Sequence, residues 1–305
     1  MSTFWTIPMR SLAEWVEAEI DPVRGLIRQG MHAVMLATAR LDGRFPAMVM
    51  KGGVLMAVRY GSARFTTDVD YSTTARLDEM DVAMFVGDLA ARLQGEADAL
   101  DYDMACRIQG HRVNPPRPEA TFPTLQVKVG VARLSRAAEL RRLHAGMAPH
   151  AFSIDYSFNE WPAATEVIAV EHGTPIRTYD LTDLIAEKYR SLLQQTVRNR
   201  TRYQDVYDLH LLLAGCGEID GVLCAAVLAK LMRSAEGKLP VPTGMEMRDE
   251  GLIARTRERY SELEQLVDAP PPFMLAYEAV RVFYEALPWP APRAPVPAPA
   301  AGSAG

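Results

Sequence analysis

The spacing of apolar residues divides the chain into a helical beginning, a strand-rich middle and a helical end. Before residue 45, apolar residues recur at the spacing of helices. From 45 to 158 the period is mostly two, in short runs separated by Gly and Pro, with a helix expected around 77–93. Helical spacing then returns, and helices are expected near 181–196, 203–214, 219–233, 249–267 and 273–286. The pattern predicts an α+β fold, in which a mixed sheet with helices precedes a helical domain.

Domain boundaries follow from this division. We expect one domain over 1–179, with its early helices covering the sheet, and a helical C-terminal domain over 180–288. The segment 289–305 reads WPAPRAPVPAPAAGSAG, and such a Pro and Ala sequence cannot bury enough apolar surface to fold. We therefore expect a disordered tail there.

Composition narrows the function only a little. The 305 residues are 49% hydrophobic and 23% charged, as in ordinary globular proteins, and the formal net charge is −5. No global positive field attracts nucleic acid, so any RNA must meet a local basic patch. Three cysteines are too few for a disulfide framework, and no apolar run is long enough to cross a membrane. We expect a soluble, cytoplasmic protein with no membrane partner.

Asp68 and Asp70 are the first candidates for chemistry. Residues 64–71 alternate like a strand, so the two carboxylates project from one face, about 7 Å apart. Two like charges at this spacing suit a hard cation that also takes phosphate oxygens. An isolated Asp-x-Asp is also typical of a solvated strand face, so the surrounding residues decide between the two.

Lys51-Gly52-Gly53 precedes this pair. An apolar strand expected at 45–50 runs into it, and helical spacing follows it. Glycines let the backbone approach a phosphate closely, and the first turn of a helix attracts its charge. Asp68 lies 15 residues after Gly53, which leaves room for a short helix and a turn. The Gly-Gly turn and the carboxylate pair could therefore face each other across one pocket.

Several segments together point to a known family. The chain carries, in order, KGG at 51–53, YG at 60–61, RFTTDVDY at 64–71, AEKY at 186–189 and QDVYDL at 204–209. These segments resemble the AbiEii/AbiGii-type toxin nucleotidyltransferases. The resemblance implies a polymerase-β-like nucleotidyltransferase fold, two Mg²⁺ ions held in part by the Asp pair, and a nucleoside triphosphate (NTP) as substrate. It also implies an RNA acceptor such as tRNA, a cognate antitoxin as protein partner, and nucleotide contacts from Lys51, Gly52, Gly53 and Arg64.

A polymerase-β-like fold needs a further carboxylate on a later strand, and Asp155 is the candidate metal ligand. Residues 152–158 alternate so that Asp155 points away from the apolar face. On the preceding strand, expected at 125–131, Lys128 points away in the same manner and could contact phosphate or RNA. A solvated face of a half-covered sheet is the alternative for both residues.

Two later helices supply further candidates. Lys188 falls on the apolar face of the helix expected from 181, where a lysine either extends to the surface or meets an anion. The resemblance favours a triphosphate oxygen, which makes Lys188 a catalytic and nucleotide-binding residue. It also marks Asp205 as catalytic and Asp208 as its structural neighbour. The loop between these helices carries basic residues that either contact RNA phosphates or are simply solvated: Arg198, Arg200 and Arg202.

The resulting hypothesis is a magnesium-dependent toxin that transfers a nucleoside monophosphate from an NTP to an RNA hydroxyl and releases pyrophosphate. Two positions depart from the family pattern, because Val54 stands where Thr or Ser is usual and Gln204 replaces Lys or Arg. One alternative is a transferase of the same fold that modifies a protein or small-molecule hydroxyl. Another is a non-catalytic regulatory protein that binds nucleotide.

Overall fold

A seven-stranded sheet organises the first part of the chain. The computed structural model describes residues 9–117, 119–162, 164–217 and 219–290. Within these residues the strand order is β3-β4-β5-β2-β1-β7-β6. The strands are β1 Val49–Lys51, β2 Asp68–Ser72, β3 Ala105–Asn114, β4 Thr124–Ala132, β5 His150–Ser157, β6 Thr165–Ala169 and β7 Pro175–Tyr179. The α+β fold with a mixed sheet that the sequence predicts is confirmed.

The centre of the sheet combines parallel and antiparallel pairs. β2 runs parallel to β5, and β1 runs parallel to β7, whereas β1 and β2 are antiparallel to each other. The outer pairs β3–β4, β4–β5 and β6–β7 are antiparallel. The strand expected over 64–71 begins only at Asp68, because the residues before it bond to the helical half. Phe65, for example, donates its backbone N–H to the carbonyl of Leu266.

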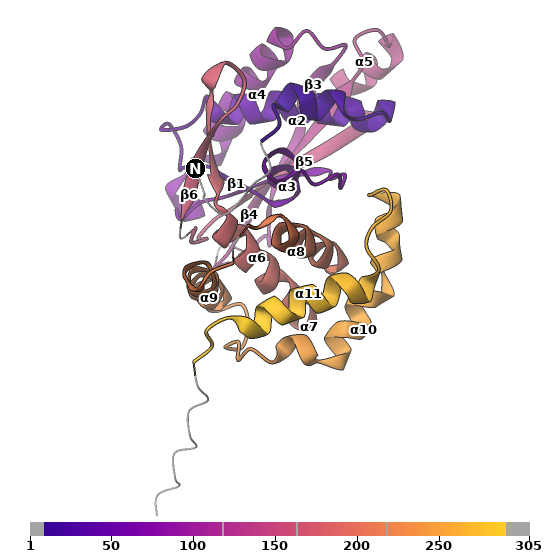
Figure 1. Cartoon of the computed structure of the whole chain (residues 1–305). Coiled ribbons are helices and arrows are strands. Elements are labelled where there is room, and N and C mark those ends of the chain that lie inside the picture. Colours follow the sequence, from indigo (N-terminus) through magenta and orange to yellow (C-terminus); the bar gives the residue numbers. More distant parts are fainter. Residues whose placement is uncertain (1–8, 118, 163, 218, 291–305) are drawn as a thin grey trace, which may run out of the picture.

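Two long helices cover one face of this sheet. They are α2 Pro22–Ala39 and α4 Val82–Ala99, and the short helix α1 Leu12–Glu17 packs against α2 (Figure 1). Gly30 lets α2 lie directly on the strands, since a Cβ there would be 2.6 Å from Val131 and 2.8 Å from Phe152. The inward strand residues, such as Val127 and Ile154, are completely buried. The core therefore occupies this face and leaves the other face for polar side chains.

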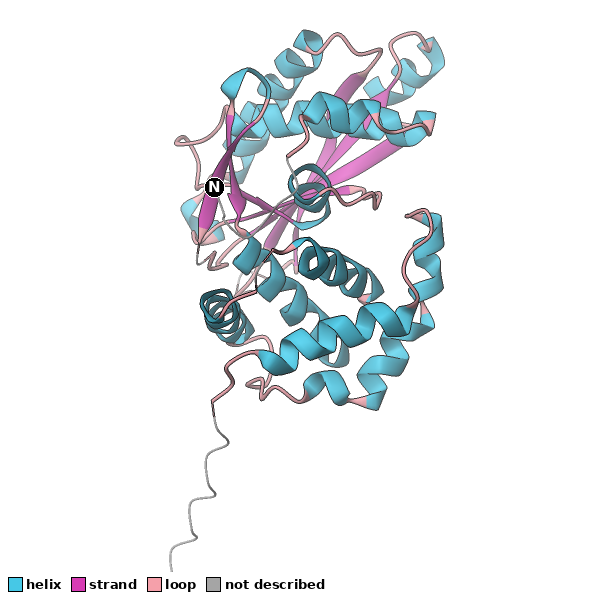
Figure 2. Cartoon of the chain, viewed as in Figure 1, coloured by secondary structure: helices cyan, strands magenta, loops and turns pink. Residues whose placement is uncertain are grey.

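After β7, the described residues form helices and the loops that connect them. Figure 2 shows the strands confined to one half and the helices of the other half packed beneath them. These helices are α6 Leu181–Leu193, α7 Gln195–Arg198, α8 Tyr203–Gly215, α9 Gly221–Ala235, α10 Glu250–Glu258 and α11 Phe273–Ala286. α6 is central, because it contacts β7 of the sheet as well as α8 and α9. The two remaining α-helices, α3 Gly52–Tyr60 and α5 Ala137–His144, lie in the sheet-containing half.

Local capping explains where the structure departs from the expected helix bounds. The helix expected over 77–93 is a short 3-10 turn at Leu77–Glu79 followed by α4, whose start is fixed by Asp81 accepting the Met84 N–H. The helix expected over 249–267 is α10 followed by a 3-10 segment at Tyr260–Gln265. The division at 179/180 as a domain boundary stays a prediction. Of the tail expected over 289–305, residues 291–305 lie outside the described residues, whereas Trp289 is described and its Nε1 donates to the carbonyl of Tyr284 at 2.7 Å.

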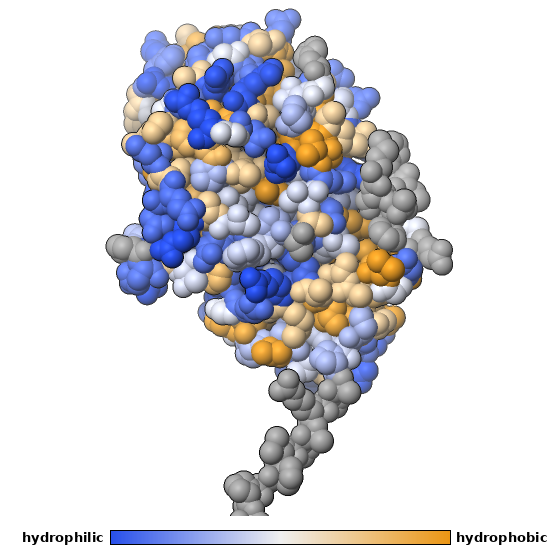
Figure 3. All heavy atoms as spheres, turned by 90° about the vertical axis from the view of Figure 1, so that its left-hand side faces the viewer, coloured by the Kyte–Doolittle hydropathy of each residue, from blue (hydrophilic) through white to orange (hydrophobic). Residues whose placement is uncertain are grey.

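The surface of the molecule is mixed. On the face in Figure 3, hydrophilic residues are interspersed with smaller apolar groups. Among the described residues, no helix is both long and apolar enough to span a membrane.

Candidate functional site

A row of polar residues crosses the sheet face opposite α2 and α4. Lys51 of β1 is the register partner of Asp70 of β2, Asp70 is the partner of Asp155 of β5, and Asp155 is the partner of Gln126 of β4. Register partners share a face, and neighbouring strands lie about 4.8 Å apart. The sheet therefore brings together the lysine before the Gly-Gly turn, one Asp of the pair and the candidate third carboxylate.

Asp70 is held against the start of α3. A Cβ at Gly52 would be 2.0 Å from Asp70 Oδ2, and the φ of Gly52 is +72°, so only glycine fits here. Burial raises the pKa of Asp70 to about 7; Lys51 opposes this rise, while Asp68 and Asp155 add to it. This half-buried carboxylate is therefore short of compensating positive charge.

Hydrogen bonds orient the other two carboxylates. Ser153 Oγ donates to Asp68 Oδ1 at 2.6 Å, and Gln126 Nε2 donates to Asp155 Oδ1 at 3.0 Å. Burial raises the pKa of Asp155, opposed by the bond from Gln126 and assisted by the charge of Asp68. Within the described part of the chain, the second oxygen of each carboxylate makes no hydrogen bond. Each carboxylate is therefore held in place through one oxygen, and its other oxygen makes no hydrogen bond with the described residues.

Lys51 is already paired with an acid from the helical half. Its Nζ donates to Glu187 Oε1 of α6 at 2.8 Å, and Arg190 NH2 reaches the same oxygen at 3.3 Å. Burial acts to lower the pKa of Lys51, but Glu187 and other nearby acids raise it above its usual value. Burial also acts to raise the pKa of Glu187, but Lys51 and Arg190 lower it to about 2. Both groups are therefore charged at neutral pH.

A second buried network joins α6, α8 and the loop before β2. Lys188 Nζ donates to Asp205 Oδ1 at 3.1 Å and to Asp208 Oδ2 at 2.6 Å. Arg64 holds Asp208 from the other side, with Nε to Oδ1 at 3.1 Å and NH2 to Oδ2 at 3.0 Å. Asp208 is completely buried, whereas Asp205 Oδ2 has no hydrogen-bond partner among the described residues. Asp205 thus keeps one buried oxygen without a partner, while both oxygens of Asp208 are engaged.

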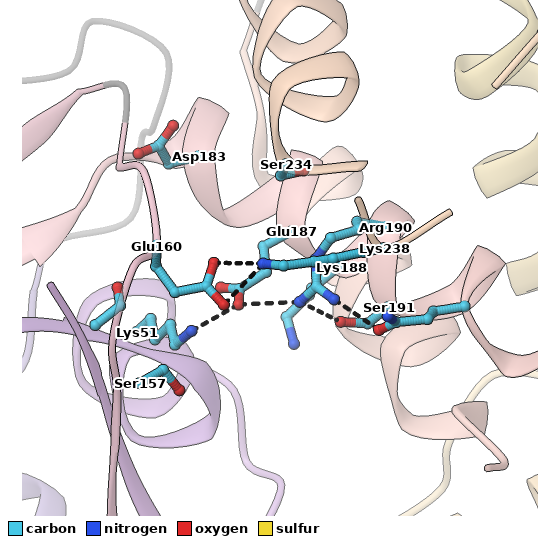
Figure 4. Close-up of polar contacts among 12 residues, drawn as sticks. Lys51, Ser157, Glu160, Asp183, Glu187, Lys188, Arg190, Ser191, Ser234 and Lys238 are labelled. Carbon is cyan, nitrogen blue, oxygen red and sulfur yellow. Dashed lines mark hydrogen bonds and ion pairs between the residues drawn. The ribbon is translucent and has the colours of Figure 1, made fainter. Parts of the chain in front are cut away.

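Several of these groups line a cleft of about 240 Å³ between the sheet and the helical half. Its described lining includes seven basic and five acidic side chains: Lys51, Lys188, Arg190, Arg198, Arg200, Arg202 and Lys238, with Asp70, Asp155, Glu160, Glu187 and Asp205. Figure 4 shows Lys51, Glu160, Glu187 and Lys238 pointing toward one another in this region. The cleft is therefore strongly polar, and basic groups outnumber acidic ones.

Four of these lining residues were not singled out by the sequence. Glu187 and Arg190 flank Lys188 on α6, so their proximity to a candidate residue was the available signal. Glu160 and Lys238 are linked by two 2.9 Å contacts across 78 positions, and no local pattern marks that pairing. Pairings of this kind depend on how the helical half packs on the sheet.

Some predicted site residues do not line the cleft. Gly53 packs against Thr66, and Arg64 is engaged by Asp208 and Gln204. Asp68 and Lys128 face a separate cavity of about 510 Å³ on the same sheet face. The functional roles of these residues stay predictions.

The two residues that depart from the family pattern, Val54 and Gln204, each make defined contacts in the fold. Val54 is fully buried in the core at the start of α3. Gln204 Oε1 accepts from Arg64 NH1 at 3.3 Å, a bond that Lys or Arg at this position could not accept.

The donor set suits a magnesium ion, although no closed metal cluster is formed. Among the residues that the structure describes, no group of three or more His, Cys, Asp or Glu side chains could hold a metal ion by itself. Magnesium is usually bound by one or two carboxylates together with substrate phosphates and water. Asp70 and Asp155, adjacent in register and with raised pKa values, fit that pattern.

Comparisons with known proteins identify the fold and the family. JHP933 of Helicobacter pylori has a solved structure that matches with a TM-score of 0.51 at 14% identity, covering 88% of this chain and 93% of that one. A second H. pylori structure, described as a candidate nucleotidyltransferase, matches with the same TM-score and identity and covers 88% and 96%. These likenesses show the fold.

No curated protein sequence matches this chain significantly. Residues 34–286 match the family described as nucleotidyl transferase AbiEii toxin, type IV toxin–antitoxin system. The chain is therefore a nucleotidyltransferase and belongs to the AbiEii toxin family.

Proposed function

We propose that this enzyme transfers a nucleoside monophosphate from an NTP to a hydroxyl of RNA, with tRNA as the expected acceptor and pyrophosphate as the product. The observation that carries the proposal is the cleft in which Asp70 and Asp155 face a surplus of basic side chains. As a member of a toxin family of type IV toxin–antitoxin systems, the chain is expected to be paired with an antitoxin.

The charge distribution of the cleft suits a triphosphate. Arginine and lysine are the usual ligands of phosphate oxygens. Burial lowers the pKa of Arg198, and the neighbouring Arg190, Arg200 and Arg202 lower it further. Positive charge therefore accumulates at this end of the cleft, and a bound triphosphate would relieve the repulsion.

The opposite wall supplies the ligands for magnesium. Asp70 and Asp155 are the residues that would hold it, and Gln126 and Gly52 restrict how far these two carboxylates can move. When bound, magnesium stabilises negative charge on phosphate oxygens and lowers the pKa of a hydroxyl nucleophile. The raised pKa of Asp70 supports this assignment, because a cation would offset the repulsion between neighbouring carboxylates.

The transfer itself requires positioning and charge stabilisation. An acceptor hydroxyl oxygen bonds to the α-phosphorus, the bond from this phosphorus to the bridging oxygen breaks, pyrophosphate leaves, and the hydroxyl proton passes to solvent. Lys188 is fixed beside the cleft by Asp205 and Asp208, so its charge can stabilise the phosphate oxygens without reorganisation. Asp205 Oδ2 is buried in the wall of the cleft without a hydrogen-bond partner among the described residues, so a donor group of the substrate that reaches this wall would satisfy it.

A transfer assay with matched variants tests the proposal. Purified protein is incubated with Mg²⁺, each α-labelled NTP and total tRNA, and the labelled product is separated from free nucleotide. We expect label on RNA with the wild type and a loss of at least ~100-fold with Asp70→Asn. Asp268→Asn makes the same chemical change at an exposed position and should transfer normally.

Other outcomes point to the two alternatives. Label on a protein or a small molecule, with none on RNA, would assign another acceptor to the same fold. Binding of NTP with no label on any acceptor would contradict transfer and favour a regulatory nucleotide-binding protein. Full transfer by Asp70→Asn would remove the basis for the proposed magnesium site.

A further inference from the structure

A second cavity lies beside the carboxylates on the same sheet face. It has a volume of about 510 Å³ and is lined in part by Asp68 and Ser153, and by His111, Arg112 and Lys128 from β3 and β4. Asp68 lies two residues before Asp70 on β2, so the two carboxylates are about 7 Å apart. Asp70 and Asp155 line the first cleft, whereas Asp68 lines this one. The carboxylates therefore stand between two cavities.

The second cavity carries basic side chains that no carboxylate of the described residues neutralises. In the first cleft, Lys51, Lys188 and Lys238 are each paired with a carboxylate, and Arg198, Arg200 and Arg202 are the lining cations without an ion pair to the described residues. In the second, the Lys128 ammonium group is exposed and forms no ion pair or hydrogen bond with the described residues. Arg112 is also exposed, and only its Nε is engaged, by Gln126 Oε1 at 2.9 Å. These cations are thus available to an anion from outside.

Helix α5 extends the basic surface beyond this cavity. Gly130 of β4 lies on the same face as Lys128, and a Cβ there would be 2.4 Å from the Cβ of Ala148, just after α5. α5 contacts β3 and β4, and its last turn carries exposed Arg141 and Arg142. A chain of phosphates leaving the cavity on this side would therefore meet further positive charge.

We infer that the second cavity binds the acceptor as a single-stranded RNA end, with its phosphodiesters against Arg112 and Lys128 and its terminal hydroxyl directed to the carboxylates. The assignment rests on the proposed function and gives each cavity one substrate. A volume of this size fits roughly one or two nucleotides rather than a duplex. Arg112 remains linked through Gln126 to Asp155, so acceptor contact and carboxylate position are coupled.

Lys128→Ala is the cleanest test, because its side chain makes no contact that the fold requires. Binding of a fluorescent single-stranded RNA ending in a 3′-hydroxyl is measured by anisotropy without NTP, over a series of salt concentrations. We expect the dissociation constant to rise about 10-fold. The slope of the logarithm of affinity against the logarithm of salt should fall in magnitude by about 0.7, as for one lost phosphate contact. NTP binding should not change.

Matched variants separate local from general charge effects. Arg92→Ala removes one exposed positive charge from α4, on the opposite side of the sheet, and should bind RNA as the wild type does. Gln126→Ala removes the anchor of Arg112 and of Asp155 without removing positive charge. It should slow transfer at saturating RNA and leave the salt slope unchanged. In the transfer assay, Lys128→Ala should raise the KM for RNA while the KM for NTP and kcat stay within about twofold.

The outcomes distinguish this inference from the proposed function. If the wild type labels RNA, but Lys128→Ala and Arg112→Ala bind RNA with unchanged affinity and salt slope, the acceptor lies elsewhere and the inference is wrong. If the wild type labels a protein in place of RNA, the proposed acceptor and this inference both fail. If Lys128→Ala and Arg92→Ala weaken binding equally, the RNA contacts are non-specific and the cavity is not the site.

Discussion

Replacing Asp208 by Asn should destabilise the fold more than the same change at Asp205. Asp208 is completely buried and accepts three hydrogen bonds, two from Arg64 and one from Lys188. Both cations hold the pKa of this carboxyl below its usual value, against the effect of burial. Asparagine would remove the charge that these two buried cations share.

The structure sets the expected size of this effect. Removing one partner of a buried ion pair costs ~3 to 5 kcal/mol, because the remaining charge stays buried and uncompensated. Among the described residues, Asp205 would be the one carboxylate left in this network, and it contacts Lys188, whereas Arg64 would keep only its hydrogen bond to the neutral Gln204. We therefore expect Asp208→Asn to lose at least ~3 kcal/mol of the free energy of unfolding. Asp205→Asn keeps an acceptor for Lys188 beside an open cleft, so it should lose less than ~1.5 kcal/mol.

Urea unfolding of both variants, followed by tryptophan fluorescence, measures this difference. With a urea dependence of about 3 kcal/mol per M, Asp208→Asn should lower the midpoint by about 1 M. Nucleotide transfer, assayed at urea concentrations below the unfolding transition, should rank the two variants the other way. At equal amounts of folded protein, Asp205→Asn should lose more transfer activity than Asp208→Asn. Equal midpoints for the two variants, or a wild-type midpoint for Asp208→Asn, would refute the structural role of Asp208.

Two further changes test the start of α3 and the Lys51–Glu187 pair. Gly52→Ala should lower the free energy of unfolding by more than ~2 kcal/mol and abolish transfer, because it places a side chain at a positive φ and against Asp70. Gly95→Ala, which adds a methyl group in open space on α4, should instead raise the free energy of unfolding by up to ~1 kcal/mol. Chemical denaturation and the transfer assay on both variants check this, and equal effects would contradict it. The pKa of Glu187 is about 2 in the folded chain, against a usual 4.5. Its charge therefore contributes ~3 kcal/mol to the free energy of unfolding above pH ~4.5, and this contribution is lost as the pH falls toward 2. The stability difference between the wild type and Glu187→Gln should therefore be largest at pH 7 and shrink below pH ~4.5 in urea titrations; a difference independent of pH would contradict the pairing.

The sequence predicted the fold well where periodicity and short-range signals determine structure. The period of two located the strand-rich segment, and helical spacing located α6, α8 and α11 within a few residues. Bounds were less accurate where tertiary contacts intervene. β2 starts only at Asp68, because Arg64 and Phe65 bond to the helical half, and a local pattern contains no information about that partner.

In the candidate site, too, local alternation predicted part of the arrangement, and long-range contacts decide the rest. Alternation placed Asp68, Asp70 and Asp155 on outward faces of strands, but the register of β2 with β5 decides that Asp70 and Asp155 are neighbours. For Arg64 the motif suggested a nucleotide contact, while the fold places its guanidinium on Asp208. That pairing spans 144 positions and depends on α8 packing beside the loop that precedes β2. Long-range ion pairs of this kind are outside what spacing can indicate.

Asp68 and Asp70 have a geometry that the alternation of their strand alone does not reveal. A strand places residues i and i+2 on one face, but what covers each of them depends on neighbouring elements. Helix α6 and the start of α3 enclose Asp70, whereas Asp68 lies where β3 and β4 leave the face open. The enclosed position is suited to a small polyanion held by fixed charges, and the open position to a longer substrate that enters from solvent. On the proposed function, one Asp-x-Asp segment would face two substrates, because Asp70 lines the enclosed cleft and Asp68 the open cavity.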